Sequence, residues 1–360
     1  MNTNLLPIML DGPKPGRQNT LLGVAEAVNP HRQLVLSDTL AGHSCCAEFA
    51  LSAREHTRHF LDFQKALQEA EALIGDQISQ IPTDVRPVFL SYGSTDSTVL
   101  AGLLLKIKRP DTILVSIHQP NLAAPLFDLV VTTPAEQARE TSTRMLEVES
   151  IPNRITDGLL AREREKWGSR LLTPSKKLVA LVVGGSVSIQ GGDGKSGTEL
   201  LTADHAKDMA QQALAIAKAN GANLVVTNSF RTPPDVTRIL KEMLAPHSIY
   251  FYDYQEGGEN PYFGYLACAD TAIVTADSMS MISEVVDSGI ETLIYLPPNL
   301  LQAKHDRFLI RMLESKQIKP LELGSDSTPS RPIHASDQIA DEIRLIAAQP
   351  AVLKPIGAHC

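Results

Sequence analysis

The segment CADTAIVTADSMSMISE, residues 268–284, is the most informative part of this chain. Its apolar run, residues 271–275, has the length and the β-branched content of a strand that is buried on both faces of a parallel sheet. The run ends at Asp277, and a helical pattern then continues to Ser288 and stops at Gly289. Small hydroxyls and one carboxylate at the junction of a strand and a helix are typical of a ligand site in an open α/β sheet.

The same alternation of short apolar runs and longer helical patterns extends over the rest of the chain. We expect further strands at residues 33–36, 88–91, 112–117, 126–132, 177–183, 223–227, 248–252 and 292–296. Helical patterns occupy residues 20–28, 159–167, 204–220, 235–244 and 337–348. This rhythm predicts an α/β protein with doubly wound, Rossmann-like parallel sheets.

A break in the pattern near residues 171–175 divides the chain into two halves of similar size. A charged helix precedes the break, and a new strand with a glycine turn follows it. We therefore expect an N-terminal domain at residues 1–172, a C-terminal domain at residues 173–349 and a tail at residues 350–360.

The composition argues against several classes of protein. The chain has 360 residues and a net charge of −8, which disfavours a nucleic-acid partner because neutralising phosphates requires a basic face. No apolar run approaches the ~20 residues of a membrane span, and the N-terminus lacks the positive region of a signal peptide. We expect a soluble, cytoplasmic protein.

The sequence also lacks the usual metal and cofactor motifs. Its cysteines form no C-x-x-C pair, which argues against a zinc site; they are Cys45, Cys46, Cys268 and Cys360. No G-x-G-x-x-G follows the first apolar run, so the dinucleotide fingerprint is missing. We therefore expect no bound metal and no cofactor.

The loop after residues 271–275 is the first candidate site. Ser278 or Ser280 can cap the following helix, because a serine hydroxyl accepts hydrogen bonds from first-turn N–H groups. Those N–H groups and the helix dipole favour an anion. Glu284 lies about one turn further on, where a carboxylate can bind paired hydroxyls such as those of a ribose. The alternative is a capped helix with a partly buried glutamate.

Two other loops follow strands in the same way. Residues 227–233 place Ser229 and Arg231 after a strand and before a helix, where an arginine can hold phosphate. Residues 10–20 form a glycine- and proline-rich loop after the first apolar run; its candidate residues are Asp11, Gly12, Gly16, Arg17 and Asn19. The alternatives are a surface arginine and a plain surface turn.

These motifs together resemble one family. Residues 274–284 are similar to the V-T-x-D-S-x-S-M-x-S-E signature of the mitochondrial-fission ELM family. Residues 12–27 resemble its G-x-P-G-H-x-x-Q-x-x-G-L-A-E-A opening, and residues 127–131 resemble its F-D-L-V-V strand. The glycine turn at residues 184–185 and the N-P-Y at residues 260–262 also match, so the resemblance spans nearly the whole chain.

The resemblance implies a GT-B-like fold, in which two Rossmann-like domains face a cleft, and a metal-independent glycosyltransferase that uses a nucleotide-sugar donor. The acceptor would be a cell-envelope glycan or lipid, reached from the inner face of the membrane. In this picture Glu284 holds the donor ribose, and Arg231 neutralises the departing diphosphate. The donor-binding residues would be Gly184, Gly185, Ser186, Ser229, Arg231, Asp277, Ser278, Ser280 and Glu284. An acceptor-side base would come from Asp11 or His118.

The chain departs from the family pattern at three places. Arg17 stands where a histidine is usual, and Phe230 replaces one arginine of T-S-R-R-T-P. Thr133 to Glu136 lie where the family shows P-x-H-D. These departures leave two alternatives open: an interaction or scaffold protein of the fission-factor type, and a nucleotide-sugar epimerase.

Overall fold

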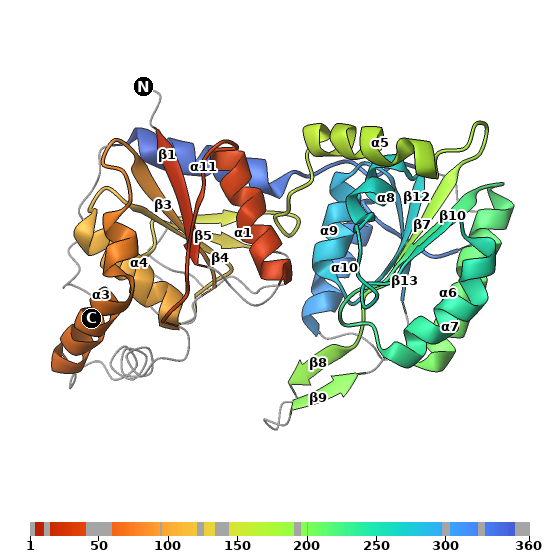
Figure 1. Ribbon diagram of the computed structural model, residues 1–360, viewed down its shortest axis with the longest axis horizontal. Coiled ribbons are helices and arrows are strands. Elements are labelled where there is room, and N and C mark those ends of the chain that lie inside the picture. Colours follow the sequence, from red (N-terminus) through yellow and green to blue (C-terminus); the bar gives the residue numbers. More distant parts are fainter. Residues whose placement is uncertain are drawn as a thin grey trace. The chain divides into compact units, whose positions relative to one another are not determined.

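The computed structural model describes residues 4–10, 15–40, 60–93, 96–120, 126–133, 144–190, 196–199, 201–296, 303–322 and 328–349. The chain forms two compact units, each built around a six-stranded parallel sheet (Figure 1). The first unit comprises Met1–Arg154 and Ala335–Cys360, and the second comprises Ile155–His334. The predicted α/β class with two Rossmann-like parallel sheets is confirmed.

The first unit has the strand order β2-β1-β3-β4-β5-β6, and every neighbouring pair is parallel. One face of the sheet packs on α3 and α4, and the other packs on α1 and α11. The elements are β1 (Leu5–Leu10), α1 (Pro15–Val28), β2 (Leu34–Leu36), α3 (Phe60–Ser79), β3 (Arg86–Tyr92), α4 (Asp96–Lys108), β4 (Ile113–Ile117), β5 (Leu129–Thr132), β6 (Met145–Glu147) and α11 (Ala335–Ala348).

The second unit has the strand order β11-β10-β7-β12-β13-β14, again entirely parallel. Its elements are α5 (Asp157–Leu171), β7 (Leu178–Val182), β8 (Val187–Gln190), β9 (Ser196–Glu199), α6 (Ala203–Ala219), β10 (Asn223–Thr227), α7 (Pro234–Leu244), β11 (Tyr250–Tyr252), α8 (Tyr262–Cys268), β12 (Thr271–Thr275), α9 (Met279–Asp287), β13 (Glu291–Tyr295), α10 (Ala303–Glu314) and β14 (Lys319–Pro320). Counted from β7, this is the Rossmann order 3-2-1-4-5-6, whose direction reverses between β7 and β12.

Local signals in the sequence explain where the helices of the second unit begin and end. Thr202 and His205 form a capping box at the start of α6, and Gly221, with φ of 60°, follows its end. Pro234 opens α7, because proline suits the first helical position. The antiparallel hairpin of β8 and β9 and the short strand β14 were not predicted.

The division into units differs from the predicted boundary at residues 172–173. Helix α5 belongs to the second unit, because the buried ring of Trp167 packs against Gly264 of α8. The last helix, α11, returns to the first unit, where Ile339 and Ile343 join the core beneath α1. The link between the units therefore falls at residues 154–155 and 334–335.

Candidate functional site

The candidate site lies at the point where the strand order of the second unit reverses. The glycine turn of Gly184 and Gly185 follows β7, and Asp277 follows the neighbouring strand β12. The Gly184 N–H donates a hydrogen bond of 2.7 Å to Thr275 Oγ1 at the end of β12. A Cβ on Gly184 would overlap both carboxylate oxygens of Asp277, so the approach of the two loops requires glycine here.

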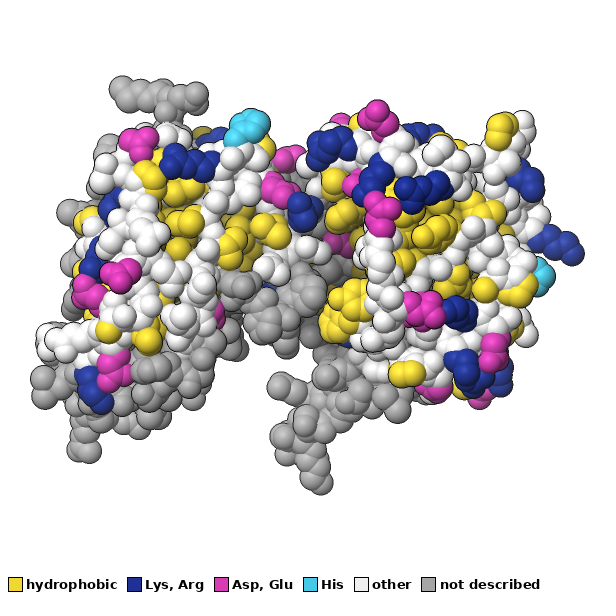
Figure 2. All heavy atoms as spheres, viewed as in Figure 1, with side chains coloured by type: hydrophobic (Ala, Val, Ile, Leu, Met, Phe, Trp, Pro, Cys, Tyr) yellow, Lys and Arg dark blue, Asp and Glu magenta, His cyan; other side chains and the backbone are white. Residues whose placement is uncertain are grey.

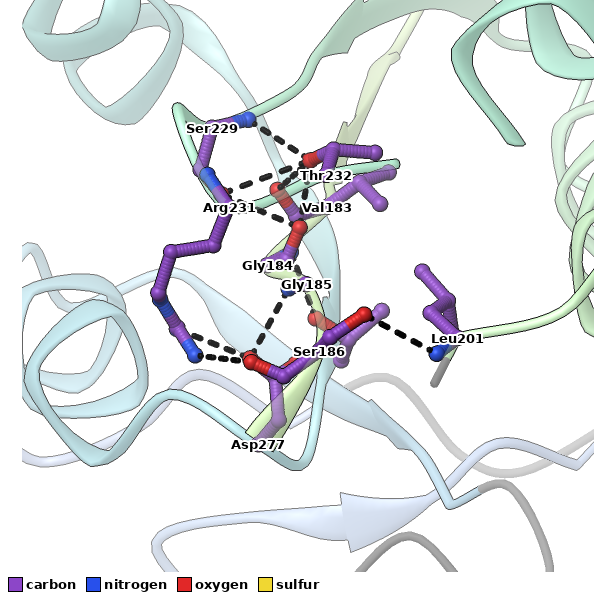
Figure 3. Close-up of polar contacts among 10 residues, drawn as sticks. Val183, Gly184, Gly185, Ser186, Leu201, Ser229, Arg231, Thr232 and Asp277 are labelled. Atoms are coloured by element: carbon purple, nitrogen blue, oxygen red, sulfur yellow. Dashed lines mark hydrogen bonds and ion pairs between the residues drawn. The ribbon is translucent and has the colours of Figure 1, made fainter. Parts of the chain in front are cut away.

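Asp277 and Arg231 form an ion pair across this turn (Figure 3). Asp277 Oδ2 accepts hydrogen bonds from Arg231 Nη2 at 2.8 Å and from the Gly185 N–H at 2.9 Å. The Asp277 side chain is 0% exposed, whereas that of Arg231 is 31% exposed. Asp277 Oδ1 is buried and accepts no hydrogen bond within the described part of the chain. The ion pair therefore holds the Arg231 guanidinium at the surface. Beside it lies one buried acceptor atom, Asp277 Oδ1, that is available for a further hydrogen bond.

Arg231 is positioned by a tight turn after β10. The Thr232 N–H donates to the Ser229 carbonyl at 3.0 Å, and the Ser229 hydroxyl donates to the Gly184 carbonyl at 3.0 Å. The Thr232 hydroxyl donates to the same carbonyl. A Cβ on Gly185 would overlap the backbone of Arg231. The structure thus brings together Gly184, Gly185, Ser229, Arg231 and Asp277, and it uses the Ser229 hydroxyl to fix the turn.

Ser186 and the first turn of α9 border this cluster. The Ser186 carbonyl accepts a 3.3 Å hydrogen bond from Arg231 Nη1. Ser278 is the N-cap residue of α9, as predicted, but its side chain does not make the hydrogen bond that was expected of the cap. Its ψ of 88° departs from the extended value that directs a cap hydroxyl onto the first turn. Ser280 is half-buried within that turn.

Glu284 lies in the second turn of α9 and is held by a tyrosine. Glu284 is 5% exposed, and its Oε2 accepts a 2.7 Å hydrogen bond from the Tyr262 hydroxyl at the start of α8. Burial, with the Glu284 carboxylate beside it, raises the pKa of Tyr262 well above its usual value, so the phenol stays a donor at neutral pH. Tyr262 belongs to the N-P-Y motif, but the sequence alone did not predict its hydrogen bond to Glu284.

In the first unit, Gly16, Arg17 and Asn19 lie in α1, so the prediction that they belong to a loop is wrong. Helix α1 begins at Pro15, because proline is favoured in the first turn of a helix. Asp11 and Gly12, the other residues of that predicted loop, lie outside the described residues.

Arg17 and His118 both contact the ring of Tyr92. The guanidinium carbon of Arg17 lies 5.2 Å from the centre of the Tyr92 ring, and the His118 ring packs edge-on against Tyr92 at 4.5 Å. His118 follows β4 with a φ of 74°, in the left-handed region. Sequence reasoning missed Tyr92, although it ends β3. Thr133 is buried, and Glu136 lies outside the described residues.

The described ranges contain no group of three or more His, Cys, Asp or Glu side chains placed to share a metal ion. Within those same ranges, no helix has both the length and the apolar character to cross a membrane. Cys268 is a buried free thiol, and burial raises its pKa.

Residues 15–345 match the mitochondrial fission ELM1 family. The chain belongs to this family. An uncharacterized protein of Rickettsia prowazekii is 26% identical over 327 residues, which cover 80% of this chain and 86% of that protein. The mitochondrial fission protein ELM1 of Arabidopsis thaliana is 26% identical over 225 residues, which cover 56% of this chain and 50% of that protein.

A solved structure aligns with this chain over nearly the whole length of both. It is the UDP-GlcNAc 2-epimerase from Methanocaldococcus jannaschii, with 12% sequence identity and a TM-score of 0.49. The alignment covers 96% of this chain and 99% of the epimerase.

Proposed function

We propose that this protein is a GT-B-like, metal-independent glycosyltransferase that takes a sugar from a nucleotide-activated donor bound in the second unit. The proposed acceptor is a cell-envelope glycan or lipid at the inner face of the membrane. The observation that carries the proposal is the convergence of Gly184, Gly185, Arg231 and Asp277 at the strand-order reversal, with the buried Glu284 on the helix that follows. Open α/β sheets bind nucleotides at such a reversal.

The diphosphate and the ribose of a nucleoside diphosphate each have a complementary group in this site. The uncapped first turn of α9 and the partly exposed Arg231 supply positive potential for the diphosphate. The glycine turn lets Asp277 and the Arg231 loop pack closely together, which holds the guanidinium in place. Glu284, oriented by Tyr262, supplies a carboxylate for the ribose hydroxyls. Hydrogen bonds to charged groups contribute about 1.5–3 kcal/mol each, so two or three of them supply about 3–9 kcal/mol of the roughly 8 kcal/mol that micromolar binding requires.

In the proposed transfer, an acceptor hydroxyl oxygen forms a bond to the anomeric carbon of the sugar. The bond from that carbon to the diphosphate oxygen breaks, the diphosphate keeps the electron pair, and the hydroxyl proton passes to a base. Arg231 stabilises the charge that develops on the leaving diphosphate. Asp11 and His118 stay candidates for the base.

Replacing Glu284 with glutamine is expected to weaken nucleoside diphosphate binding tenfold or more, by about 1.5–3 kcal/mol, because the ribose loses its charged acceptor. Isothermal titration calorimetry measures the effect with uridine diphosphate and its 2′,3′-dideoxy analogue. The wild-type protein should prefer the ribonucleotide, and the Glu284→Gln variant should show a smaller preference, because the glutamine amide oxygen is an uncharged and weaker acceptor.

The matched control is Glu242→Gln, because Glu242 is exposed on α7 and pairs only with Arg238 among the described residues. Equal discrimination of the two nucleotides by wild type and Glu284→Gln would contradict the ribose role. A wild-type protein that binds no nucleotide but retains a stable protein partner would favour the scaffold alternative over transfer.

A further inference from the structure

Two aromatic side chains stand exposed beside the candidate site. Figure 2 shows hydrophobic side chains at the surface of the second unit, and among its described residues Phe230 and Tyr254 are the exposed aromatic pair. Phe230 is 50% exposed and Tyr254 is 40% exposed. Their ring centres lie 6.2 Å apart, with a tilt of 55°. Aromatic rings left in water next to a polar site are candidates for contact with a planar or apolar ligand group.

The two rings are carried on loops that are fixed to each other. Phe230 and Tyr254 follow the neighbouring strands β10 and β11, at the same edge of the sheet as the glycine turn. The buried Asn228 joins the loops: its Oδ1 accepts the Tyr254 N–H at 2.7 Å, and its Nδ2 donates to Asp253 Oδ1 at 3.0 Å. The exposed rings therefore sit on a preorganised support, which lowers the entropy lost on binding.

Phe230 also occupies the same turn as Arg231. The hydrogen bond from the Thr232 N–H to the Ser229 carbonyl makes Phe230 and Arg231 the two central residues of this turn. One of them reaches Asp277, and the other is exposed to solvent. An exposed aromatic ring followed directly by an arginine offers a stacking surface next to a cation. A ligand that matches both features has a planar ring and an anionic group, as a nucleotide does.

We propose that Phe230 and Tyr254 form the nucleobase subsite of this protein, in which the base stacks on the aromatic pair while Arg231 holds the adjoining phosphates. This inference rests on the proposed function. Strands β10 and β12 are two strand spacings apart, about 10 Å, so one nucleotide can contact both Phe230 and the α9 side of the site.

The test compares ligands with and without a base. Calorimetric titrations use uridine diphosphate, adenosine diphosphate and inorganic pyrophosphate against wild type, Phe230→Leu and Tyr254→Leu. Leucine keeps the apolar bulk of these side chains and removes the aromatic face. Stacking predicts that each variant binds both nucleotides about tenfold more weakly and binds pyrophosphate as well as wild type does. Ile249→Ala, which truncates another exposed side chain of the same unit, should bind all three ligands like wild type.

Three outcomes would overturn the inference, and they are distinguishable from one another. If both variants bind nucleotides like wild type while Glu284→Gln loses affinity, the ribose role stands and the base lies elsewhere. If pyrophosphate weakens as much as the nucleotides, Phe230 only shapes the turn that carries Arg231. If wild type binds pyrophosphate but neither nucleotide, the proposed function fails together with the base subsite.

Discussion

Replacing Arg231 with methionine is expected to lower the free energy of unfolding of the second unit by about 3–5 kcal/mol. The reason is the environment of Asp277, whose side chain is 0% exposed and whose cationic partner is Arg231 at 2.8 Å. Methionine leaves the carboxylate in the interior with the Gly185 N–H but without a compensating charge. The same variant should bind nucleoside diphosphates more weakly, because the phosphates lose their guanidinium.

A double variant separates these effects. Adding Asp277→Asn to Arg231→Met removes the uncompensated charge, so most of the lost stability should return while nucleotide affinity stays low. Urea unfolding followed by the fluorescence of Trp167, the single tryptophan of the chain, reports on the second unit. Arg238→Met, which breaks only an exposed pair with Glu242, is the control and should cost less than about 1 kcal/mol. A double variant as unstable as the single one would contradict this account of the pair.

Replacing Gly264 with alanine is expected to destabilise the second unit by about 1–3 kcal/mol, because the added methyl group would overlap the ring of Trp167. The ring is fully buried, so it has little room to move away from α8. Besides a lower urea midpoint, a changed tryptophan emission spectrum is expected, since the contact is with the indole itself.

Gly168→Ala is the matched control on α5. A Cβ at Gly168 lies 3.5 Å from the Leu172 side chain, which is an ordinary contact. Alanine there should therefore stabilise the helix by about 0.5–1 kcal/mol. If Gly264→Ala and Gly168→Ala changed stability in the same direction, close packing of α5 on α8 would not be the reason that Gly264 is needed.

The sequence allowed the sheet of the second unit and part of its site to be predicted, for a clear physical reason. Strands such as β7, β10 and β12 are apolar on both faces, which gives continuous apolar runs. The carboxyl ends of parallel strands share one edge, so Gly184, Arg231 and Asp277 could be assigned to one site before their contacts were known.

Other features depend on tertiary packing that no local pattern encodes. The hydrogen bond from Tyr262 to Glu284 joins α8 to α9, and the two residues are 22 positions apart in the sequence. The return of α11 to the first unit likewise depends on which core accepts Ile339. The polar hairpin of β8 and β9 lacks the apolar runs that reveal the buried strands, so it was missed.

A crystal structure with a bound nucleoside diphosphate tests the central claim most directly. The account predicts ribose hydroxyls on the Glu284 carboxylate, and phosphate oxygens at the Gly184–Gly185 turn and Arg231. A nucleotide bound away from the β7–β12 edge of the second unit, with the Arg231–Asp277 pair untouched, would contradict it.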